Sequence, residues 1–212
     1  MVIVTEFNCT VQTYRAQFEQ LVFPRPTTCP HCQAAHSFVG HGCYPRKPLD
    51  AQQVYPLRIK RWYCTACQRT LSLLPSFLLG FRHYLLEVIQ AVVIAHYEDA
   101  ISWRQVAERC APQGAPSLRT MKRWCQSLAT QAAAWLGQIE QTLAQQAPAL
   151  PLLDALGLGA EALAPPQGLL AASLHLLAWA KTCWPELAAY GFNERLRFLW
   201  HWGQARGLAR LI

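Results

Sequence analysis

The spacing of apolar and polar residues changes along the chain from a strand-like period to a helical one. Residues 54–63 (VYPLRIKRWY) alternate apolar and basic side chains in their second half, which predicts a strand that leads directly into Cys64. Leu57 and Ile59 would face one side of this strand and Arg58 the other. A looser alternation over residues 1–25 predicts a short lead-in strand and helix.

Helical spacing begins after Pro75. Residues 84–97 have apolar residues throughout their length, which predicts a buried helix. Ser102, followed three residues later by Gln105, has the spacing of a capping box and predicts a second helix that ends near Cys110.

A third helix is predicted to begin at Ser117 and to continue to about Gln146, because Gly137 is the only glycine inside it. Residues 147–168 are rich in Pro, Gly and Ala and predict a linker, and two further helices follow, split near Pro185. The third helix carries an apolar stripe at helical spacing that we expect to face inward: Leu118, Met121, Cys125 and Leu128.

Two CxxC pairs, 31 residues apart, flank the predicted strand. In such a pair both sulfurs come from one tight turn and can bind one side of a tetrahedral ion, and a second pair completes the coordination sphere. The sequence therefore predicts a structural Zn²⁺ site bound by Cys29, Cys32, Cys64 and Cys67.

Two alternatives stay open at this site. The cysteines could be small buried residues or a redox pair. A mixed ligand set could also form, because other residues that bind zinc lie nearby in the sequence: His31, His36, His41 and Cys43.

Together these patterns predict a mostly α protein with a small β zinc ribbon, in which the zinc ribbon is followed by a helix-turn-helix-like bundle and C-terminal helices. We expect three regions. Residues 1–75 would hold the lead-in and the four-cysteine zinc ribbon, and residues 76–146 the helix-turn-helix-like helical domain. Residues 147–212 would hold the linker and the C-terminal helical segment.

The formal net charge is +7. Residues 1–128 carry 14 Lys and Arg against 7 Asp and Glu, and residues 129–212 carry 5 against 5, so the whole excess lies in the first 128 residues. A one-sided basic field favours a polyanion partner, although a solvated charged surface is the alternative. Four basic residues around the second CxxC pair would contact the phosphate backbone: Arg58, Lys60, Arg61 and Arg69.

The predicted third helix carries a second basic group near its start. One face, at spacing i, i+3, i+4, i+7, holds Arg119, Lys122, Arg123 and Gln126. A recognition helix enters the major groove with its N-terminal residues, where Arg pairs with guanine, Gln with adenine, and Lys can hold phosphate. Ser117 and Thr120 would add contacts at the helix N-terminus, and an ordinary amphipathic helix with a solvated basic face is the alternative.

Neither a membrane span nor an export signal is expected. The most apolar run, residues 169–180, has 12 residues and contains His175, whereas a spanning helix needs about 20. The N-terminus lacks the basic start and apolar stretch of a signal peptide. Nine cysteines without an export signal favour metal binding in a reducing compartment over a disulfide framework.

Several motifs taken together resemble the zinc-ribbon and helix-turn-helix region of bacterial insertion-sequence transposases and related mobile-element proteins. The similarity covers residues 27–130 and rests on CPHC, GHGCYPRK, RIKRWYCTACQRTLSLLP and ISWRQVAERC…SLRTMKRWC. The resemblance implies binding to element-end DNA. By position it also marks the four knuckle cysteines as metal ligands and the helix that begins at Ser117 as the DNA reader.

The chain departs from a complete transposase after residue 128, where the acidic residues lie in helical or linker-like surroundings rather than on the strands of a nuclease core. The sequence therefore predicts that the chain is not an enzyme. It predicts a non-catalytic DNA-binding protein of a mobile genetic element, a transposition accessory factor or a regulator, in the bacterial cytoplasm and associated with the nucleoid. Its partner would be duplex DNA, without membrane contact.

An interaction adaptor is the alternative function. Its apolar C-terminal half would dock onto a larger nucleic-acid-processing complex. The same C-terminal helices could otherwise form the core, or bind a second protomer or another mobile-element protein. The residues that leave this choice open are Phe192, Leu196, Phe198, Leu199 and Trp202.

Overall fold

A computed structural model describes the chain except for residues 147–173, 175, 178–179, 181–183, 189–193 and 209–212. The chain divides into two compact units, residues 1–86 (unit 1) and residues 87–212 (unit 2), and each is described by itself. The predicted linker at residues 147–168 and the start of the predicted helix after it lie outside the described residues. The predicted division into three regions stays a prediction.

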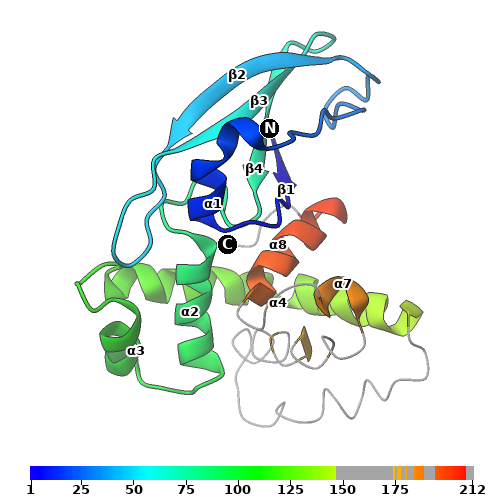
Figure 1. Ribbon diagram of the computed structural model, residues 1–212. Coiled ribbons are helices and arrows are strands. Elements are labelled where there is room, and N and C mark those ends of the chain that lie inside the picture. The colour runs from blue at the N-terminus through cyan, green and yellow to red at the C-terminus, as the bar shows by residue number, and fades with distance from the viewer. Residues whose placement is uncertain (147–173, 175, 178–179, 181–183, 189–193, 209–212) are drawn as a thin grey trace. The chain divides into compact units, whose positions relative to one another are not determined.

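Unit 1 is built on a four-stranded sheet with the strand order β1-β4-β3-β2 (Figure 1). The strands are β1 (Val2–Thr5), β2 (Phe38–Arg46), β3 (Leu57–Cys64) and β4 (Arg69–Pro75). β2, β3 and β4 pair antiparallel, as expected for strands joined by short connections, and β1 pairs parallel to β4.

The predicted fold class is wrong. The described residues form an α/β mixture with a mixed four-stranded sheet, not a mostly α protein with a small zinc ribbon ahead of a helical bundle. The strand ending at Cys64 is confirmed, and so is the lead-in strand and helix. The error arose because the predicted lead-in strand, β1, is part of the main sheet: Val2 lies opposite Ser72, and a pairing across that sequence distance leaves no local pattern.

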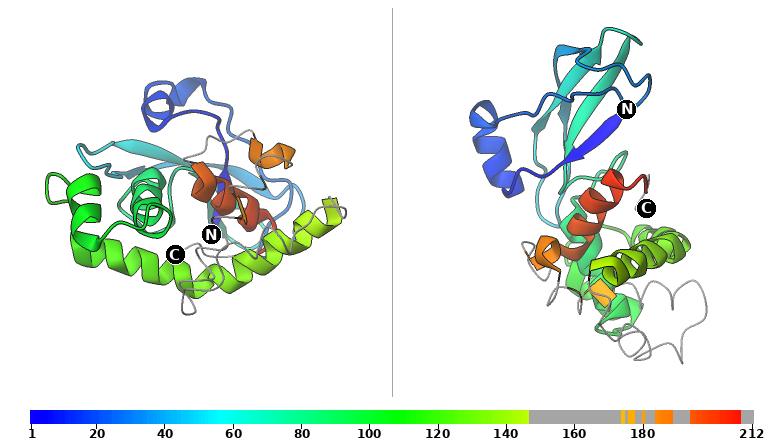
Figure 2. Two further views of the ribbon diagram at one scale, coloured as in Figure 1. Left: turned by 90° about the horizontal axis from the view of Figure 1, so that it is seen from below. Right: turned by 90° about the vertical axis from the view of Figure 1, so that its right-hand side faces the viewer.

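The lead-in helix covers one face of this sheet (Figure 2). α1 (Val11–Ala16) begins at Thr10, whose hydroxyl accepts the Thr13 amide proton, and it is followed by a short 3₁₀ turn, η1 (Phe18–Gln20). The Tyr14 hydroxyl donates to the backbone oxygen of Arg58 on β3 at 3.0 Å. The Tyr14 ring also contacts a set of edge-on aromatic rings that form the core on this side: Phe7, Phe18 and Phe77.

In unit 2, the three predicted helices are confirmed as α2 (Leu86–Tyr97), α3 (Trp103–Cys110) and α4 (Leu118–Gln146). The capping box predicted at Ser102 and Gln105 is present. α2 and α3 are held together by an ion pair between Asp99 and Arg109 and by the His96 ring, which lies 3.9 Å from the Trp103 ring, centroid to centroid.

The C-terminal elements of unit 2 are α7 (Pro185–Ala188) and α8 (Arg195–Ala205). Trp184 and Trp202 pack edge-on at 5.2 Å, and Phe198 packs against both. The sequence left open whether a set of apolar C-terminal residues forms the core or an interface. The described members of this set are at most 4% exposed: Leu196, Phe198, Leu199 and Trp202. These side chains are therefore packed within the chain, and Phe192 lies outside the described residues.

One buried charge stands out in unit 2. The Arg195 side chain is 1% exposed, forms an ion pair with Glu98 and donates to the backbone oxygen of Leu174 at 3.0 Å. A buried guanidinium without such partners would be costly, so these contacts hold α8 in place. None of the described helices is long and apolar enough to cross a membrane.

Candidate metal centre

Two similar turns bring the four knuckle cysteines together. The backbone N–H of Gln33 donates to the oxygen of Cys29, and that of Gln68 to the oxygen of Cys64, both at 2.9 Å. Both glutamines adopt the left-handed conformation, with φ of 60° and 59°. The second turn joins β3 to β4, so the sheet itself positions this pair of sulfurs. The repeated pattern CxxCQ is the sequence signal for these matching turns.

The sulfur positions fit a tetrahedral metal ion. All four Sγ atoms lie within 4.8 Å of one another, and the Cys29–Cys67 and Cys32–Cys64 pairs are each separated by 3.8 Å. A tetrahedron with metal–sulfur bonds of about 2.3 Å has edges of about 3.8 Å. A disulfide would need a separation of about 2.05 Å. The predicted convergence of the four cysteines is thus confirmed, and the cluster could hold a metal ion.

The surroundings of the cluster are apolar on one side and open on the other. Cys29 and Cys64 are fully buried and pack with Phe38 and Leu71, whereas Cys32 is exposed. An ion held here would be anchored to the core of unit 1 and reachable from solvent on the Cys32 side.

The thiols differ in their affinity for protons. A hydrogen bond with the Ser37 hydroxyl, 3.1 Å from Cys64 Sγ, and the backbone N–H of Cys67 lower the pKa of Cys64 to about 6. Burial, followed by the hydrogen bond with Cys64, raises the pKa of Cys67 to about 12. A metal binds cysteine as thiolate, so loading this cluster displaces the remaining protons.

The structure does not bring together a mixed set of cysteine and histidine ligands. Among the described residues, the only group of three or more potential ligands that converges is the four-cysteine cluster. His31 and His36, although close to Cys32 in the sequence, are not part of this group. Cys43 lies opposite Lys60 on β2, and the His41 ring lies 5.4 Å from the Tyr63 ring.

Sequence reasoning missed Ser37, which supports the cluster without being a ligand. Its backbone oxygen accepts the Thr65 N–H at 2.8 Å, which fixes the serine beside the second knuckle. Its hydroxyl then bonds Cys64 Sγ. The distance along the chain between Ser37 and Cys64 gave no signal for this contact.

We expect Ser37→Ala to weaken metal binding by roughly tenfold to a hundredfold, the usual cost of removing a group that orients a ligand. The four thiolates would remain, so the metal still binds at saturation. Competition against a chromophoric chelator measures the affinity, and Ser72→Ala on β4 is the matched control. Equal affinities for the Ser37 variant and the parent chain would show that this hydrogen bond has no role.

The basic residues predicted beside the cluster divide between the two faces of the sheet. Side chains alternate along β3, so Arg58 and Lys60 share the face of Cys64. Arg69 lies directly opposite Cys64 on β4 and shares that face too. Arg61 belongs to the other face. The structure therefore brings three of the four cations to the cluster's side of the sheet.

These cations are not equally available. Arg58 forms an ion pair with Glu19, and its guanidinium lies 4.2 Å from the centre of the Phe18 ring. Lys60 is partly exposed and Arg69 is exposed. Lys60 Nζ in turn lies 5.3 Å from the centre of the Trp62 ring, so Arg69 is the one of the three with no such contact among the described residues. Sequence spacing gave no sign of the contacts of Arg58.

In unit 2, the predicted basic face of α4 is exposed along its whole length, at Arg119, Lys122, Arg123 and Gln126. Of the predicted inward stripe, Met121, Cys125 and Leu128 are buried, but Leu118 is 39% exposed, contrary to the prediction. Lys122 Nζ lies 5.6 Å from the centre of the Trp103 ring on α3. No described acidic side chain forms an ion pair with these three cations.

The start of α4 is capped as predicted. The Ser117 hydroxyl accepts the Thr120 amide proton at 3.3 Å, and the two hydroxyl oxygens lie 3.0 Å apart. Both hydroxyls are therefore engaged at the helix start, close to the basic face.

Comparison with known proteins adds one match. Residues 29–124, which include both knuckles and the basic start of α4, match a family described as "Domain of unknown function (DUF6431)". No curated protein and no solved structure matches the chain.

Proposed function

We propose that this chain is a non-catalytic, DNA-binding protein of a mobile genetic element. It would hold duplex DNA through the basic face of α4 and through basic residues beside a structural Zn²⁺ centre. The observation that carries the proposal is the α4 face, where three exposed cations have no ion-pair partner among the described residues. Such a face near a helix start suits the major groove and the phosphates that flank it.

Zinc is the metal that best suits the cluster. Four thiolates at tetrahedral spacing are a closed set typical of structural zinc, with no position left for a substrate or water. Zinc and four thiolates together carry a charge of −2. Lys60 and Arg69 on the same face would offset part of this charge, and Arg69 would still face solvent.

The assignment to a mobile element rests on the resemblance of the knuckle and helix motifs to insertion-sequence proteins. On that ground we propose element-end DNA as the target and the bacterial nucleoid as the location. Sequencing the DNA that copurifies with the chain would test this, and recovery of unrelated genomic fragments without enrichment would contradict it.

Affinity for duplex DNA is expected to fall steeply with salt. If about five phosphates are neutralised, the logarithm of the association constant should fall with log salt at a slope of about −4 to −5, because each contact releases a counterion. Fluorescence anisotropy with a labelled duplex over a range of salt concentrations measures the slope. A slope near zero, or no binding at low salt, would contradict the proposal.

A further inference from the structure

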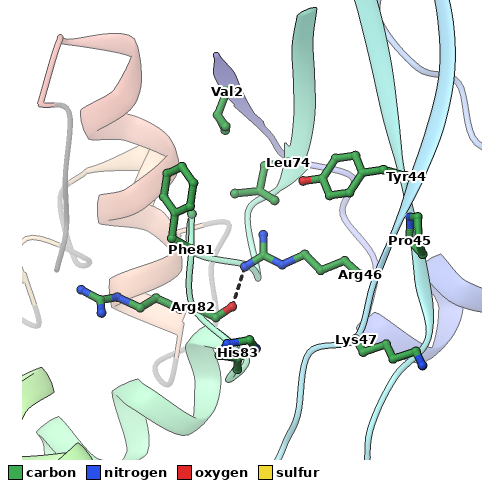
Figure 3. Close-up of a pocket in the computed structure, with 10 residues that line it drawn as sticks. Val2, Tyr44, Pro45, Arg46, Lys47, Leu74, Phe81, Arg82 and His83 are labelled. Carbon is green, nitrogen blue, oxygen red and sulfur yellow. Dashed lines mark hydrogen bonds between the residues drawn. The ribbon is translucent and has the colours of Figure 1, made fainter.

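Unit 1 contains a cavity that the proposed duplex site does not use. Its volume is about 570 Å³, and it lies between β2 and the turn that follows β4 (Figure 3). The described residues that line it are Val2, Tyr44, Pro45, Arg46, Lys47, Leu74, Gly80, Phe81, Arg82 and His83. None of them is acidic, so the cavity has a one-sided positive lining.

The strand register places this cavity on the sheet face opposite the metal cluster. Tyr44 lies opposite Ile59, and Arg46 opposite Leu57. Directly opposed residues point to the same face of the sheet. Arg58 lies between Leu57 and Ile59 on β3, so its side chain points to the opposite face, and α1 and η1 cover that opposite face. A ligand in the cavity would therefore not compete with α1 or with the metal.

Phe81 is held at the mouth of the cavity in an unusual conformation. Its side chain is 98% exposed and its φ is 59°, in the left-handed region that bulky residues rarely adopt. Arg46 fixes this turn because its guanidinium donates to the backbone oxygens of Leu79 and Arg82, on either side of the phenylalanine. A partly buried arginine thus fixes a turn that presents an aromatic ring to solvent, and backbone strain of this kind is often found at binding sites.

Arg46 itself lacks an acidic partner in the cavity. Burial lowers the pKa of Arg46, and its neighbour Tyr44 acts in the opposite direction. Figure 3 shows Leu74 between the Phe81 and Tyr44 rings and the Arg46 guanidinium below Leu74, while the Arg82 and Lys47 side chains extend away from it. An anion entering the cavity would meet a cation that no acidic side chain of the lining neutralises.

The same chemistry continues along the sheet beyond the cavity. The Arg61 guanidinium lies 5.9 Å from the centre of the Tyr44 ring, and its buried Nε has no hydrogen-bond partner among the described residues. Further along β3, Tyr63 is partly exposed and packs against His41. Aromatic rings and cations therefore alternate along this face, with more positions than a single nucleotide could occupy.

We infer that this face binds single-stranded nucleic acid. Unpaired bases stack on Phe81 and Tyr44, and Arg46 and Arg61 hold the phosphates between them. Stacking platforms combined with a positive track are how proteins bind single strands without reading their sequence. The inference goes beyond the proposed duplex site, because it needs none of the residues of α4.

The test compares Phe81→Leu with Phe81→Tyr in the full chain. Leucine keeps an apolar side chain and removes the aromatic face, whereas tyrosine keeps that face. Binding of a fluorescent oligothymidylate of about ten nucleotides, followed by anisotropy at physiological salt, should weaken roughly fivefold to a hundredfold for Phe81→Leu. It should stay within about twofold for Phe81→Tyr. Val22→Ala, at another exposed apolar residue of unit 1, is the control and should not change binding.

An abasic oligomer of the same length separates stacking from charge. It keeps the phosphates and offers no bases, so the parent chain should bind it more weakly than the oligothymidylate, and Phe81→Leu should not weaken it further. Equal binding of oligothymidylate by Phe81→Leu and the parent chain would overturn the inference. So would equal binding of the abasic oligomer and the oligothymidylate by the parent chain, which would indicate a general polyanion surface.

Failure here is distinguishable from failure of the duplex site. Phe81→Leu should leave duplex affinity unchanged, since its ring lies outside α4. A chain that binds duplex DNA but not the oligothymidylate overturns this inference and leaves the proposed function standing. The reverse result overturns the duplex site alone.

Discussion

Cys64→Ser is expected to abolish metal binding at the four-cysteine cluster and to unfold the sheet of unit 1. Cys64 is the last residue of β3 and is fully buried, and its Sγ atom lies 3.8 Å from the Sγ atom of Cys32. Structural zinc contributes on the order of 10 kcal/mol to small sites, which is comparable to the whole stability of a typical domain. Mass spectrometry of the metal content and hydrogen exchange over β2, β3 and β4 would measure both effects.

Cys43→Ser is the matched control for this variant. Cys43 lies on β2 of the same sheet, outside the converging group, so its replacement should leave the metal content unchanged. One equivalent of metal retained by Cys64→Ser, with the sheet still protected, would contradict the four-cysteine assignment.

The second large effect is expected on the affinity for duplex DNA. Replacing Arg119, Lys122 and Arg123 together with alanine should weaken duplex binding on the order of a hundredfold, because three phosphate or base contacts are lost. The salt slope should become shallower by about one for each cation that contacts a phosphate, to about −2 if all three do. The helix should survive, since the three side chains are exposed and alanine is a strong helix former. Anisotropy titrations over several salt concentrations measure affinity and slope together.

Arg104→Ala is the control for the loss of a positive charge outside the basic face of α4. Arg104 is an exposed cation on the neighbouring α3, but it already pairs with Glu108 at 3.0 Å. Its removal should change duplex affinity by less than about threefold, given the small energy of an exposed pair. If the triple variant binds as tightly as Arg104→Ala, with the same slope, then α4 is not the DNA reader.

The metal site was predictable because its signal is local. Each CxxC pair forms a turn within five residues, and the strand pattern over Leu57–Cys64 shows that the second turn follows a strand. The capping box at Ser102 and Gln105 is equally local and located α3 correctly. Only the convergence of the two turns needed the structure.

The fold class was not predictable on the same basis. The pairing of β1 with β4 joins residues about seventy positions apart, and the sequence of neither strand indicates which strand it pairs with. The engagement of Arg58 by Glu19 and Phe18 follows from the placement of α1 and η1 on the sheet, which the local pattern also left undetermined.

The cavity could not be predicted for a related reason. Phe81 and Arg82 lie between Pro75 and the predicted helix at residues 84–97, and the local sequence pattern predicted no role for them or for Arg46. Their roles become visible only when β2 places the Arg46 guanidinium against the carbonyl groups of the turn.

The parallel pairing of β1 also has a consequence during translation. Val2 leaves the ribosome about seventy residues before its partner Ser72. At roughly 5 to 20 residues per second this delay is about 4 to 14 s. During that interval β1 has no strand of this sheet to pair with, because its one neighbour in the sheet, β4, has not yet been made.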